Sequence, residues 1–482
     1  MELSDLVCQL RAQLARRDQE YAVLKAQYVA QKEQNAKLAE QVAMLLEKLG
    51  ANSSNSNKPP SSDSPGSGSS TNKNREKRGR KGKKRGGQPG HKGTHRELLS
   101  PDQVDEFVDF FPPQCESCWT PLAQIEDAKA SRFQVTEVPP IKPHVTEYRC
   151  HSVTCDCGHA TRAGCDEVPT SAFGPRLTSL AGLLTGVYHV SRRKTVTLLS
   201  DMLGVRISLG AVSALEQRVS EAVIPAVDEI WEKIPDAPVK HADGTSWLEA
   251  GKTMSLWTIA TAAVTVFRIL QSGSKKNLQA LFTKMCGILV SDRDSSLTFW
   301  AMENRQICWA HLLRKFISFS ERDGPAGELG REFLDYTRLI FEYWHAHSAG
   351  QIDRRTYLEY MAPVREGFED LLGRARDAGI KRLSGSCDNL WAHKDALWTF
   401  VDTRGVPPTN NHAERELRSF VLWRKRSFGA QSERGHLFAE RIMTVAHTAR
   451  KQDRDILSFL TSCCQARDLG LPTPSLFAAE TS

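Results

Sequence analysis

Long apolar runs are missing from this sequence of 482 residues. The most apolar stretch, LAGLLTGVYHV, is well short of the roughly 18 residues that cross a bilayer, so no membrane span is predicted. A secretory signal is missing too, because MELSDLVCQLRAQLARR has no apolar core behind a positive start. Without a signal, the twelve cysteines indicate reduced thiols or metal ligands in a reducing compartment rather than a disulfide framework.

Most of the chain has little excess of either charge sign, and the excess of positive charge is concentrated in one segment. The formal net charge is +7, yet residues 71–96 alone hold eleven Lys or Arg and one Glu. The polar and then basic segment 50–94 has almost nothing to form a core, so we predict a disordered linker that binds a polyanion, most commonly nucleic acid. An anionic membrane surface or a solubilising linker is the alternative. Four side chains are predicted to contact DNA phosphates: Lys81, Lys83, Lys84 and Arg85.

Residues 1–49 carry a heptad seam. Alternate steps of three and four from Val7 to Leu49 meet apolar or aromatic residues at ten of thirteen positions. A lone helix cannot bury such a seam, so the pattern predicts a coiled coil, a leucine zipper that pairs two chains in parallel. Asn35 falls at an a position, where a buried amide can fix register and favour a dimer. The alternative is an amphipathic helix that packs on its own globular body.

Residues 95–168 contain paired cysteines. A C-x2-C pair is followed about 40 residues later by a C-x-C pair. Two thiolates on one tight turn suit a tetrahedral Zn²⁺ ion, and a second pair completes the site, so we predict a small domain with a structural zinc. The predicted ligands are Cys115, Cys118, Cys155 and Cys157. Three neighbours could replace one of them: Cys150, His151 and His159. Free thiols in a small β domain are the alternative.

Residues 169–235 are predicted to be helical. An apolar helical period runs to about Leu203, a break follows at Gly204, and Ser208 opens a second helix. This is the layout of a helix-turn-helix, whose second helix can lie in the major groove of DNA. An ordinary helical hairpin would have the same pattern.

From residue 236 onward, strand patterns alternate with helical ones. Three runs, VKHADGTSWLE, MSLWTIATAA and VTVFRILQS, predict an antiparallel meander with Asp243 on its first strand. The next strand, CGILVSD, ends on Asp292, and a further strand and helix follow, as in an α/β sheet. A helical insertion at about 324–402 precedes the helix that carries Glu414. The chain is therefore predicted to be multidomain α+β, with an α/β domain at 236–452 and a helical tail at 453–482.

These three acids can converge although they are far apart in sequence, because two end adjacent strands and the third lies on a facing helix. Carboxylate oxygens suit Mg²⁺ or Mn²⁺. Two such ions about 4 Å apart would activate a hydroxyl or water on one side of a phosphodiester and stabilise the leaving oxygen on the other. By position alone each acid is weak support, since a lone Asp at a strand end is usually a turn former or a cap.

Five strings carry a resemblance to a known family: HADGTSW, LVSDRD, QICWAHLLRKF, NNHAERELR and RKRSFGAQSERG. Behind a zipper, an NSSNSNKPPSSD linker and RGGQPGHKG, they make nearly the whole chain resemble the IS66 family of insertion-sequence transposases, of the TnpC type. The resemblance implies an RNase H-like catalytic domain, whose DDE triad falls here on Asp243, Asp292 and Glu414, and accessory proteins encoded by the same element. Many relatives have an acid directly after the first Asp and an aromatic residue after SDR. This chain has Gly244 and Asp294 there, and Asp294 is a rival for the second triad position.

Basic residues beside the acids are predicted to contact the DNA backbone rather than base edges. His311 and Arg314, one helical turn apart, could bind phosphate; a solvated helix face is the alternative. A basic flank follows the third acid: Arg415, Arg418, Arg424, Lys425 and Arg426. Asn410 or Asn411 is predicted to cap the helix that carries Glu414.

Together these features predict a cytoplasmic, nucleoid-associated transposase that binds the terminal repeats of an insertion sequence. Hydrolysis at the element ends would expose a 3′ hydroxyl, and the same metal site would join that hydroxyl to target DNA, with the zipper pairing protomers into a synaptic assembly. A structure-specific nuclease would keep the fold and metal but end at hydrolysis, and it needs no zipper. A DNA-binding regulator with inert acids is a third alternative, although all three triad positions are intact.

Overall fold

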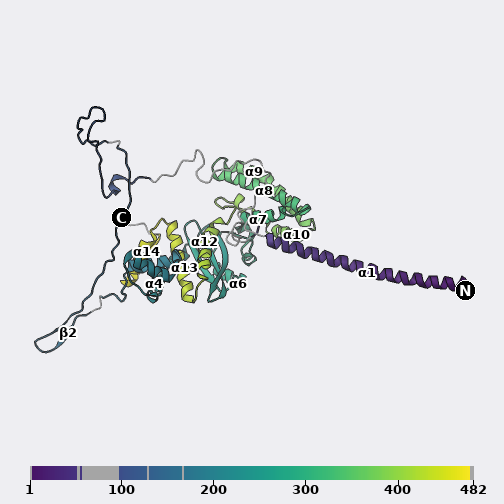
Figure 1. The fold of residues 1–482 in the computed structure, drawn as a ribbon, viewed down its shortest axis with the longest axis horizontal. Coiled ribbons are helices and arrows are strands. Elements are labelled where there is room, and N and C mark those ends of the chain that lie inside the picture. The colour runs from purple at the N-terminus through teal and green to yellow at the C-terminus, as the bar shows by residue number, and fades with distance from the viewer. Residues whose placement is uncertain (1–2, 51–54, 57–96, 128–129, 165–167, 478–482) are drawn as a thin grey trace. The chain divides into compact units, whose positions relative to one another are not determined.

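The computed structural model describes residues 3–50, 55–56, 97–127, 130–164 and 168–477 (Figure 1). The described residues divide into two compact units, one of which takes in those of Thr71–Ala163 and Thr197–Arg206. The predicted phosphate-binding residues Lys81, Lys83, Lys84 and Arg85 lie outside the described residues. Within the described ranges, no helix is both long and apolar enough to cross a membrane.

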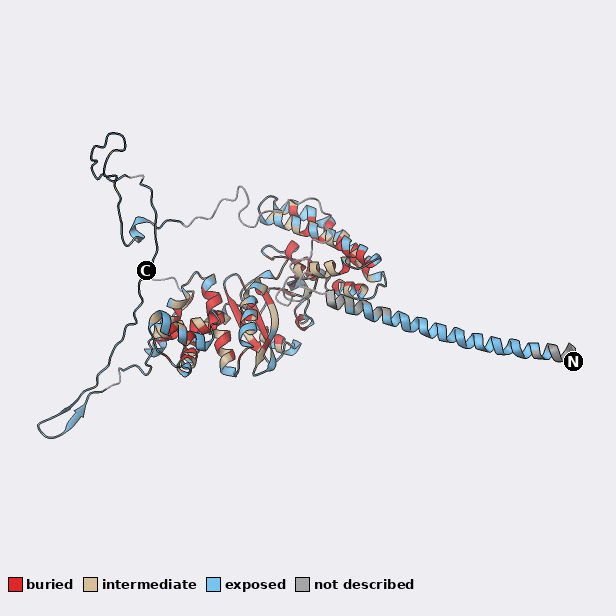
Figure 2. Cartoon of the chain, in the orientation of Figure 1, coloured by how far each residue is buried: buried red, intermediate tan, exposed pale blue. Residues whose placement is uncertain are grey.

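The N-terminal residues form one long helix, α1 (Leu3–Gly50). The seam side chains that are described along it are exposed: Leu14 is 66% exposed and Tyr21 68%. Figure 2 shows the exposed colour running along α1, whereas buried residues gather around the sheet. The described part of this seam is therefore not covered by the rest of the chain.

Residues 97–163 contain little regular structure. Their described elements are the short helix η2 (Pro101–Gln103) and a two-stranded antiparallel hairpin of β1 (Ser152–Thr154) and β2 (Ala160–Arg162). Every residue of both strands is exposed. The predicted second cysteine pair, Cys155 and Cys157, lies in the turn of this hairpin. The turn is closed by a hydrogen bond from Cys155 N–H to the carbonyl of His159 at 2.9 Å.

The described residues 168–237 contain five helices. They are α2 (Pro175–Gly182), the π-helical η3 (Leu183–Val187), α3 (Arg192–Leu203), α4 (Leu209–Ala222) and α5 (Ile224–Glu232). Ser208 caps α4 as predicted, since its hydroxyl accepts a hydrogen bond from Ala211 N–H at 3.1 Å. Gly204 has a φ of 65°, a left-handed conformation that ends α3. The two helices of the predicted layout are present, and their binding to DNA stays a prediction.

A five-stranded mixed sheet forms the centre of the second half. Its strands are β3 (Val239–Glu249), β4 (Lys252–Ala260), β5 (Thr265–Leu270), β6 (Ile288–Ser291) and β7 (Arg305–Ile307), in the order β5-β4-β3-β6-β7. The pairs β3–β4 and β4–β5 are antiparallel, which confirms the predicted meander, whereas β3–β6 and β6–β7 are parallel. The crossover from β5 to β6 contains α6 (Lys275–Leu281), and two short helices, η4 (Ser295–Leu297) and η5 (Met302–Asn304), separate β6 from β7.

Two hydrophobic clusters cover the sheet. Leu289 of β6 belongs to one cluster and its neighbour Val290 to the other, because successive strand residues point to opposite faces. The first cluster is completed by helices that include α12 (Asn411–Ser427), α13 (Glu433–Lys451) and α14 (Ile456–Asp468). The second is completed by α7 (Trp309–Ser320) and the helices of the insertion.

The edge strand β5 is closed by side chains of α13. Three backbone N–H groups of the strand, at residues 265, 267 and 269, donate to Thr448, Thr444 and Glu440 at 3.1, 3.1 and 2.5 Å. The acceptors are four residues apart on α13, and the donors are two residues apart on β5. Both spacings correspond to about 6 Å along the chain axis, so each acceptor lies beside one donor. This contact satisfies donors that an open sheet edge would expose.

Residues 324–402, predicted to be helical, contain α8 (Pro325–Ser348), α9 (Arg354–Asp377), α10 (Leu383–Trp391), η6 (Lys394–Leu397) and α11 (Thr399–Asp402). α7 packs on α8, α8 on α9, and α9 on α10. An aromatic core joins them: the rings of Phe316 and Phe333 stack at 4.5 Å, and Trp309 meets Phe368 edge to face at 5.1 Å. The insertion therefore shares one core with α7 and with the face of β6 and β7 that carries Val290 and Ile307, and the chain then continues into α12.

Candidate active site

The first two predicted acids lie on neighbouring strands. Asp243 is on β3, the central strand, and Asp292 directly follows β6. The parallel register pairs His241 with Val290, and two further steps along both strands lead to Asp243 and Asp292. Burial, followed by the charges of Asp292 and Glu414, raises the pKa of Asp243 to about 8.

Glu414 reaches the same place from the first turn of α12, a helix that packs against β3 and β4. Its Oε1 lies 3.5 Å from His311 Nδ1 and 3.9 Å from Arg314 Nη2, both on α7. Among the described residues, Glu414 Oε1, His311 Nδ1 and Arg314 Nε are buried and make no hydrogen bond. These atoms are close enough to attract one another but are not satisfied by each other, as expected where a ligand completes a site.

Asp292 and Asp294 have different surroundings. Burial raises the pKa of Asp292, although its Oδ1 accepts a hydrogen bond from Asp294 N–H at 3.0 Å. The exposed Asp294 instead caps η4, with its carboxylate accepting from Ser296 N at 2.8 Å and Ser296 Oγ at 2.7 Å. Arg305, fully buried, donates to the carbonyl of Asp292 at 2.8 Å and fixes this turn. The environment therefore favours Asp292 over its rival.

Cys308 is a neighbour that the sequence analysis missed. Among the described residues, Cys308, His311 and Glu414 form a group whose metal-ligating atoms all lie within 4.8 Å of one another. Burial raises the pKa of the Cys308 thiol to about 11, and burial together with Arg314 lowers that of His311 to about 4, so both side chains are neutral at pH 7. The C-x2-H spacing at the start of α7 was the available signal.

Asn410 does not cap α12 with its side chain, contrary to the prediction. It is fully buried, its Nδ2 donates to the carbonyl of Ala242 at 2.8 Å, and its backbone N–H donates to Cys308 Sγ at 3.1 Å. Its own carbonyl accepts from Glu414 N–H at 3.2 Å. One residue thus joins β3 beside Asp243, the start of α7 and the helix of Glu414, while Asn411 is exposed.

A second buried carboxylate, Glu416, anchors α12 to α13. It makes a short contact with His447 Nδ1 and lies 3.3 Å from Lys451 Nζ and 3.5 Å from His412 Nε2. Burial raises the pKa of Glu416, but hydrogen bonds from His412 and His447 outweigh burial and bring this pKa well below its ordinary value. Glu416 is therefore ionised and fully engaged, in contrast to Glu414 two residues earlier.

The predicted basic flank divides into two parts. Arg415, Arg418, Lys425 and Arg426 are exposed. Arg424 is half-buried and donates to Thr245 Oγ1 at 3.2 Å and to Ser246 Oγ at 2.5 Å on β3. Arg424 therefore links α12 to the sheet, and its contacts indicate a structural role rather than contact with the DNA backbone.

The glycine after the first acid is enclosed. Gly244 is opposite Trp257 of β4, and a Cβ atom built on Gly244 would lie 2.7 Å from the indole ring. Real Cβ contacts are not this short, so this ring leaves no room for a side chain at position 244.

The cysteine pairs are each on a tight turn but stay apart from each other. Trp119 N–H donates to the carbonyl of Cys115, and Gly158 N–H to that of Cys155. A hydrogen bond from Thr120 lowers the pKa of Cys118 to about 7. In the described ranges no three of the four predicted thiols come within 4.8 Å, and Cys150, an alternative ligand, is disulfide-bonded. The prediction of reduced thiols or metal ligands is therefore wrong for Cys150, and the zinc site stays a prediction.

The three triad residues fit divalent metal. Their oxygens are hard ligands, their charges repel one another, as the raised pKa of Asp243 reflects, and Glu414 Oε1 is buried with no hydrogen-bond partner among the described residues. A cation would relieve both the repulsion and the unsatisfied oxygen. The fold and the site thus define a candidate metal-dependent enzyme on a mixed α/β sheet.

Comparison with protein families agrees with this class. Residues 170–437, more than half of the chain, match the family model described as Transposase IS66 family. The chain therefore belongs to the IS66 family of transposases, which confirms the resemblance carried by the five strings. Residues 6–97 match a second model, described as Family of unknown function (DUF6444). No curated protein matches the chain.

Proposed function

We propose that this chain is a DDE-type transposase that cleaves DNA at the ends of its element and joins those ends to target DNA. Membership of a transposase family indicates DNA transposition. The observation that supports this chemistry is that Asp292, after the strand adjacent to β3, and Glu414, in the first turn of α12, are both near enough for their charges to raise the pKa of Asp243 in addition to burial. This arrangement supports an RNase H-like catalytic domain with these residues as its triad.

The triad residues would hold two Mg²⁺ or Mn²⁺ ions. When bound, such ions activate the attacking hydroxyl or water and stabilise the leaving oxygen of a phosphodiester. The sheet fixes the backbone of Asp243, and the hydrogen bond from Arg305 fixes the turn at Asp292. The two carboxylates would therefore need little rearrangement to bind the metal ions. Arg314, with Nε free of hydrogen bonds to described residues, can bind a phosphate oxygen. His311 is neutral and can add one hydrogen bond without adding charge.

DNA would lie along the exposed basic residues that follow Glu414: Arg415, Arg418, Lys425 and Arg426. They bind phosphates without reading sequence. Recognition of the terminal repeats is proposed for α4 and for a zinc domain held by the four cysteines, with the basic linker adding affinity. In this proposal the protein acts at the nucleoid in the cytoplasm.

Transposition requires two ends to be held together, and α1 is suited to that role. Its exposed apolar seam would pair with the same seam of a second chain and bring two catalytic regions into one synaptic assembly. Accessory proteins of the same element are proposed as further partners.

The test is a joining assay with labelled element-end DNA, a target plasmid and Mg²⁺. Wild type is compared with Asp292→Asn, which removes one metal-ligating charge, and with Asp294→Asn as a matched control. We expect joined product from wild type and Asp294→Asn, and a loss of at least about 100-fold in Asp292→Asn, since metal-ion stabilisation contributes several kcal/mol.

The alternatives give different products. Nicked DNA without joined product would replace the transposase proposal by a nuclease. DNA binding with no product at any metal concentration would replace it by a regulator with inert acids. An equal loss in both variants would remove Asp292 from the proposed triad.

A further inference from the structure

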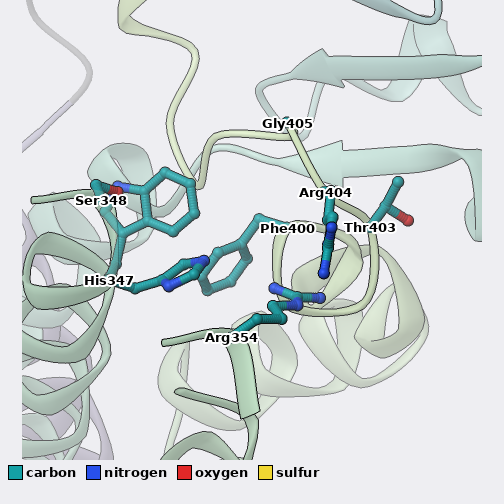
Figure 3. Close-up of a pocket in the computed structure, with 8 residues that line it drawn as sticks. His347, Ser348, Arg354, Phe400, Thr403, Arg404 and Gly405 are labelled. Carbon is teal, nitrogen blue, oxygen red and sulfur yellow. The ribbon is translucent and has the colours of Figure 1, made fainter. Parts of the chain in front are cut away.

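A cavity of about 350 Å³ lies in the helical insertion, away from the residues used above (Figure 3). Such a volume falls within the roughly 300–1,000 Å³ of pockets that bind small organic groups. Its walls come from α8, α9, α11 and the loop after α11. The lining residues are Trp344, His347, Ser348, Arg354, Phe400, Thr403, Arg404 and Gly405.

One side of the cavity is aromatic. The Trp344 and Phe400 rings meet edge to face at 5.8 Å, and Phe400 is fully buried, which fixes the pair. His347 stacks on Tyr357 at 4.7 Å with nearly parallel planes. Rigid rings that line a cavity can take a further flat ring with little loss of side-chain entropy.

The other side is positively charged. Figure 3 shows the side chains of Arg354 and Arg404 extending toward each other, with His347 and Phe400 on the opposite side. Arg354 is oriented by a short hydrogen bond to the carbonyl of Val401 and by its position 5.5 Å from the Tyr357 ring. None of the eight lining residues is acidic. Two guanidinium groups that extend toward each other favour phosphate, since the two neighbouring carboxylates have other partners: Asp353 accepts from Thr356 N–H at 2.8 Å and Asp402 lies 3.3 Å from Arg365.

A ligand that fits both walls carries a flat ring and a phosphate, as a nucleotide does. The position of the cavity in the chain indicates DNA as the source of that nucleotide. The loop of Thr403–Gly405 leads to Asn410 in six residues from Arg404, a chain length of at most about 22 Å. Trp309 N–H at the start of α7 donates to the carbonyl of Pro408 at 2.9 Å and holds this connection. A DNA strand at the candidate active site can therefore reach the cavity within a few nucleotides.

We propose that this cavity binds one unpaired nucleotide of the DNA strand being processed. The base lies against Trp344 and His347, buried Phe400 supports the Trp344 ring from behind, and the adjoining phosphate lies between Arg354 and Arg404. Stacking makes the site tolerant of base identity, because every base has a π face. The inference rests on the proposed function, since it takes its ligand from the DNA that the active site would cut.

The experiment uses the full chain without added Mg²⁺ and a duplex with one unpaired 2-aminopurine, compared with the fully paired duplex. We expect wild type to bind the bulged duplex about tenfold more tightly and to quench the 2-aminopurine, as one stacked base predicts. Trp344→Ala and Arg404→Ala should remove this preference and leave binding to the paired duplex unchanged.

Two matched controls exclude general damage. Trp391→Ala removes another partly buried tryptophan of the insertion, and Arg355→Ala removes another exposed arginine. Both should keep the preference. Wild type without a preference, or Trp344→Ala and Arg404→Ala that keep it, would overturn the proposal. Binding of free deoxyadenosine monophosphate without preference for the bulge would overturn the assignment to DNA.

The joining assay separates this inference from the proposed function. A chain that joins ends with no preference for bulged DNA loses the nucleotide site alone. A chain that prefers bulged DNA through Trp344 and forms no product keeps the nucleotide site and loses the catalytic proposal.

Discussion

Around the sheet, many polar groups are buried and most of them are paired outside the candidate site, whereas in residues 97–163 nearly every described residue is exposed. The edge of β5 is closed by α13, and Glu416 is engaged by three cationic or imidazole partners. The hairpin of β1 and β2 has no comparable cover. A segment that buries so little cannot offset the entropy of ordering its chain. The sheet region is thus organised by its own side chains, and we expect the cysteine segment to need a bound ligand.

The largest test of this contrast is the predicted zinc ion, because a structural zinc stabilises a small domain by about 10–16 kcal/mol. We expect one zinc per chain by elemental analysis, and close to none in a Cys118→Ser, Cys155→Ser double variant. Limited proteolysis should then cut within 97–163 and spare the sheet region. Cys286→Ser, which removes an exposed thiol elsewhere, should keep the zinc. A zinc-free wild type that resists the protease equally would show that the segment needs no metal.

Within the catalytic region, Glu414 and Glu416 provide a matched pair. Glu416→Gln should lower the free energy of unfolding by about 3–5 kcal/mol, since it leaves the largely enclosed Lys451 ammonium without its counter-charge and weakens the contact with His447. Glu414→Gln removes no hydrogen bond to a described residue, so its unfolding free energy should change by less than about 0.5 kcal/mol while joining activity is lost. Urea unfolding measures both, and equal losses of stability would contradict the division between a structural and a functional acid.

Asn410→Ala should cost about 1–3 kcal/mol of stability, because the buried Ala242 carbonyl is left unpaired. Joining activity should fall as well, since Asn410 connects the elements that carry Asp243 and Glu414. The control is Asn411→Ala, at an exposed position. Thermal unfolding of the two variants at matched concentration is the measurement. If the pair behaved alike, the organising role assigned to Asn410 would be wrong.

The smallest effect concerns pH. His189 stacks on Trp423 at 4.8 Å, and burial lowers its pKa to about 4. The unfolded chain has the ordinary value near 6.5 and binds the proton first, so stability is lost as pH falls from about 6.5 toward 4. Between pH 7 and 5, wild type should lose on the order of 1 kcal/mol more than His189→Asn, allowing for solvent screening. The exposed His345→Asn should match wild type in urea unfolding at both pH values, and a His189→Asn loss equal to wild type would exclude the effect.

The sequence allowed good prediction where structure is local. β-branched runs gave the strands of the meander, and Asp292 follows the end of β6 as predicted. Asp243 is on the first strand of the meander as predicted, but it lies within β3 rather than at its end. The helix start at Ser208 follows the same logic, because a cap is decided within one turn.

Prediction failed where a side chain is used at long range. Asn410 has the sequence of a capping residue, but its amide binds a carbonyl 168 residues away. Arg424 lies in a run of basic residues and was predicted to contact DNA, but it donates hydrogen bonds to β3. Cys308 was missed because its neighbour Glu414 comes from a distant helix. Only the packing of α7 and α12 on the sheet brings these groups together.

The contact between Gly244 and Trp257 has a consequence for the evolution of the family. Because the indole fills the space above the glycine, an acidic residue at position 244 would require a smaller residue opposite it on β4. The two positions should therefore covary, with a large aromatic residue accompanying glycine and a small residue accompanying an acid. Exchanging one position without the other would give an unfit intermediate, so a family member with an acid at position 244 should differ from this chain at both positions.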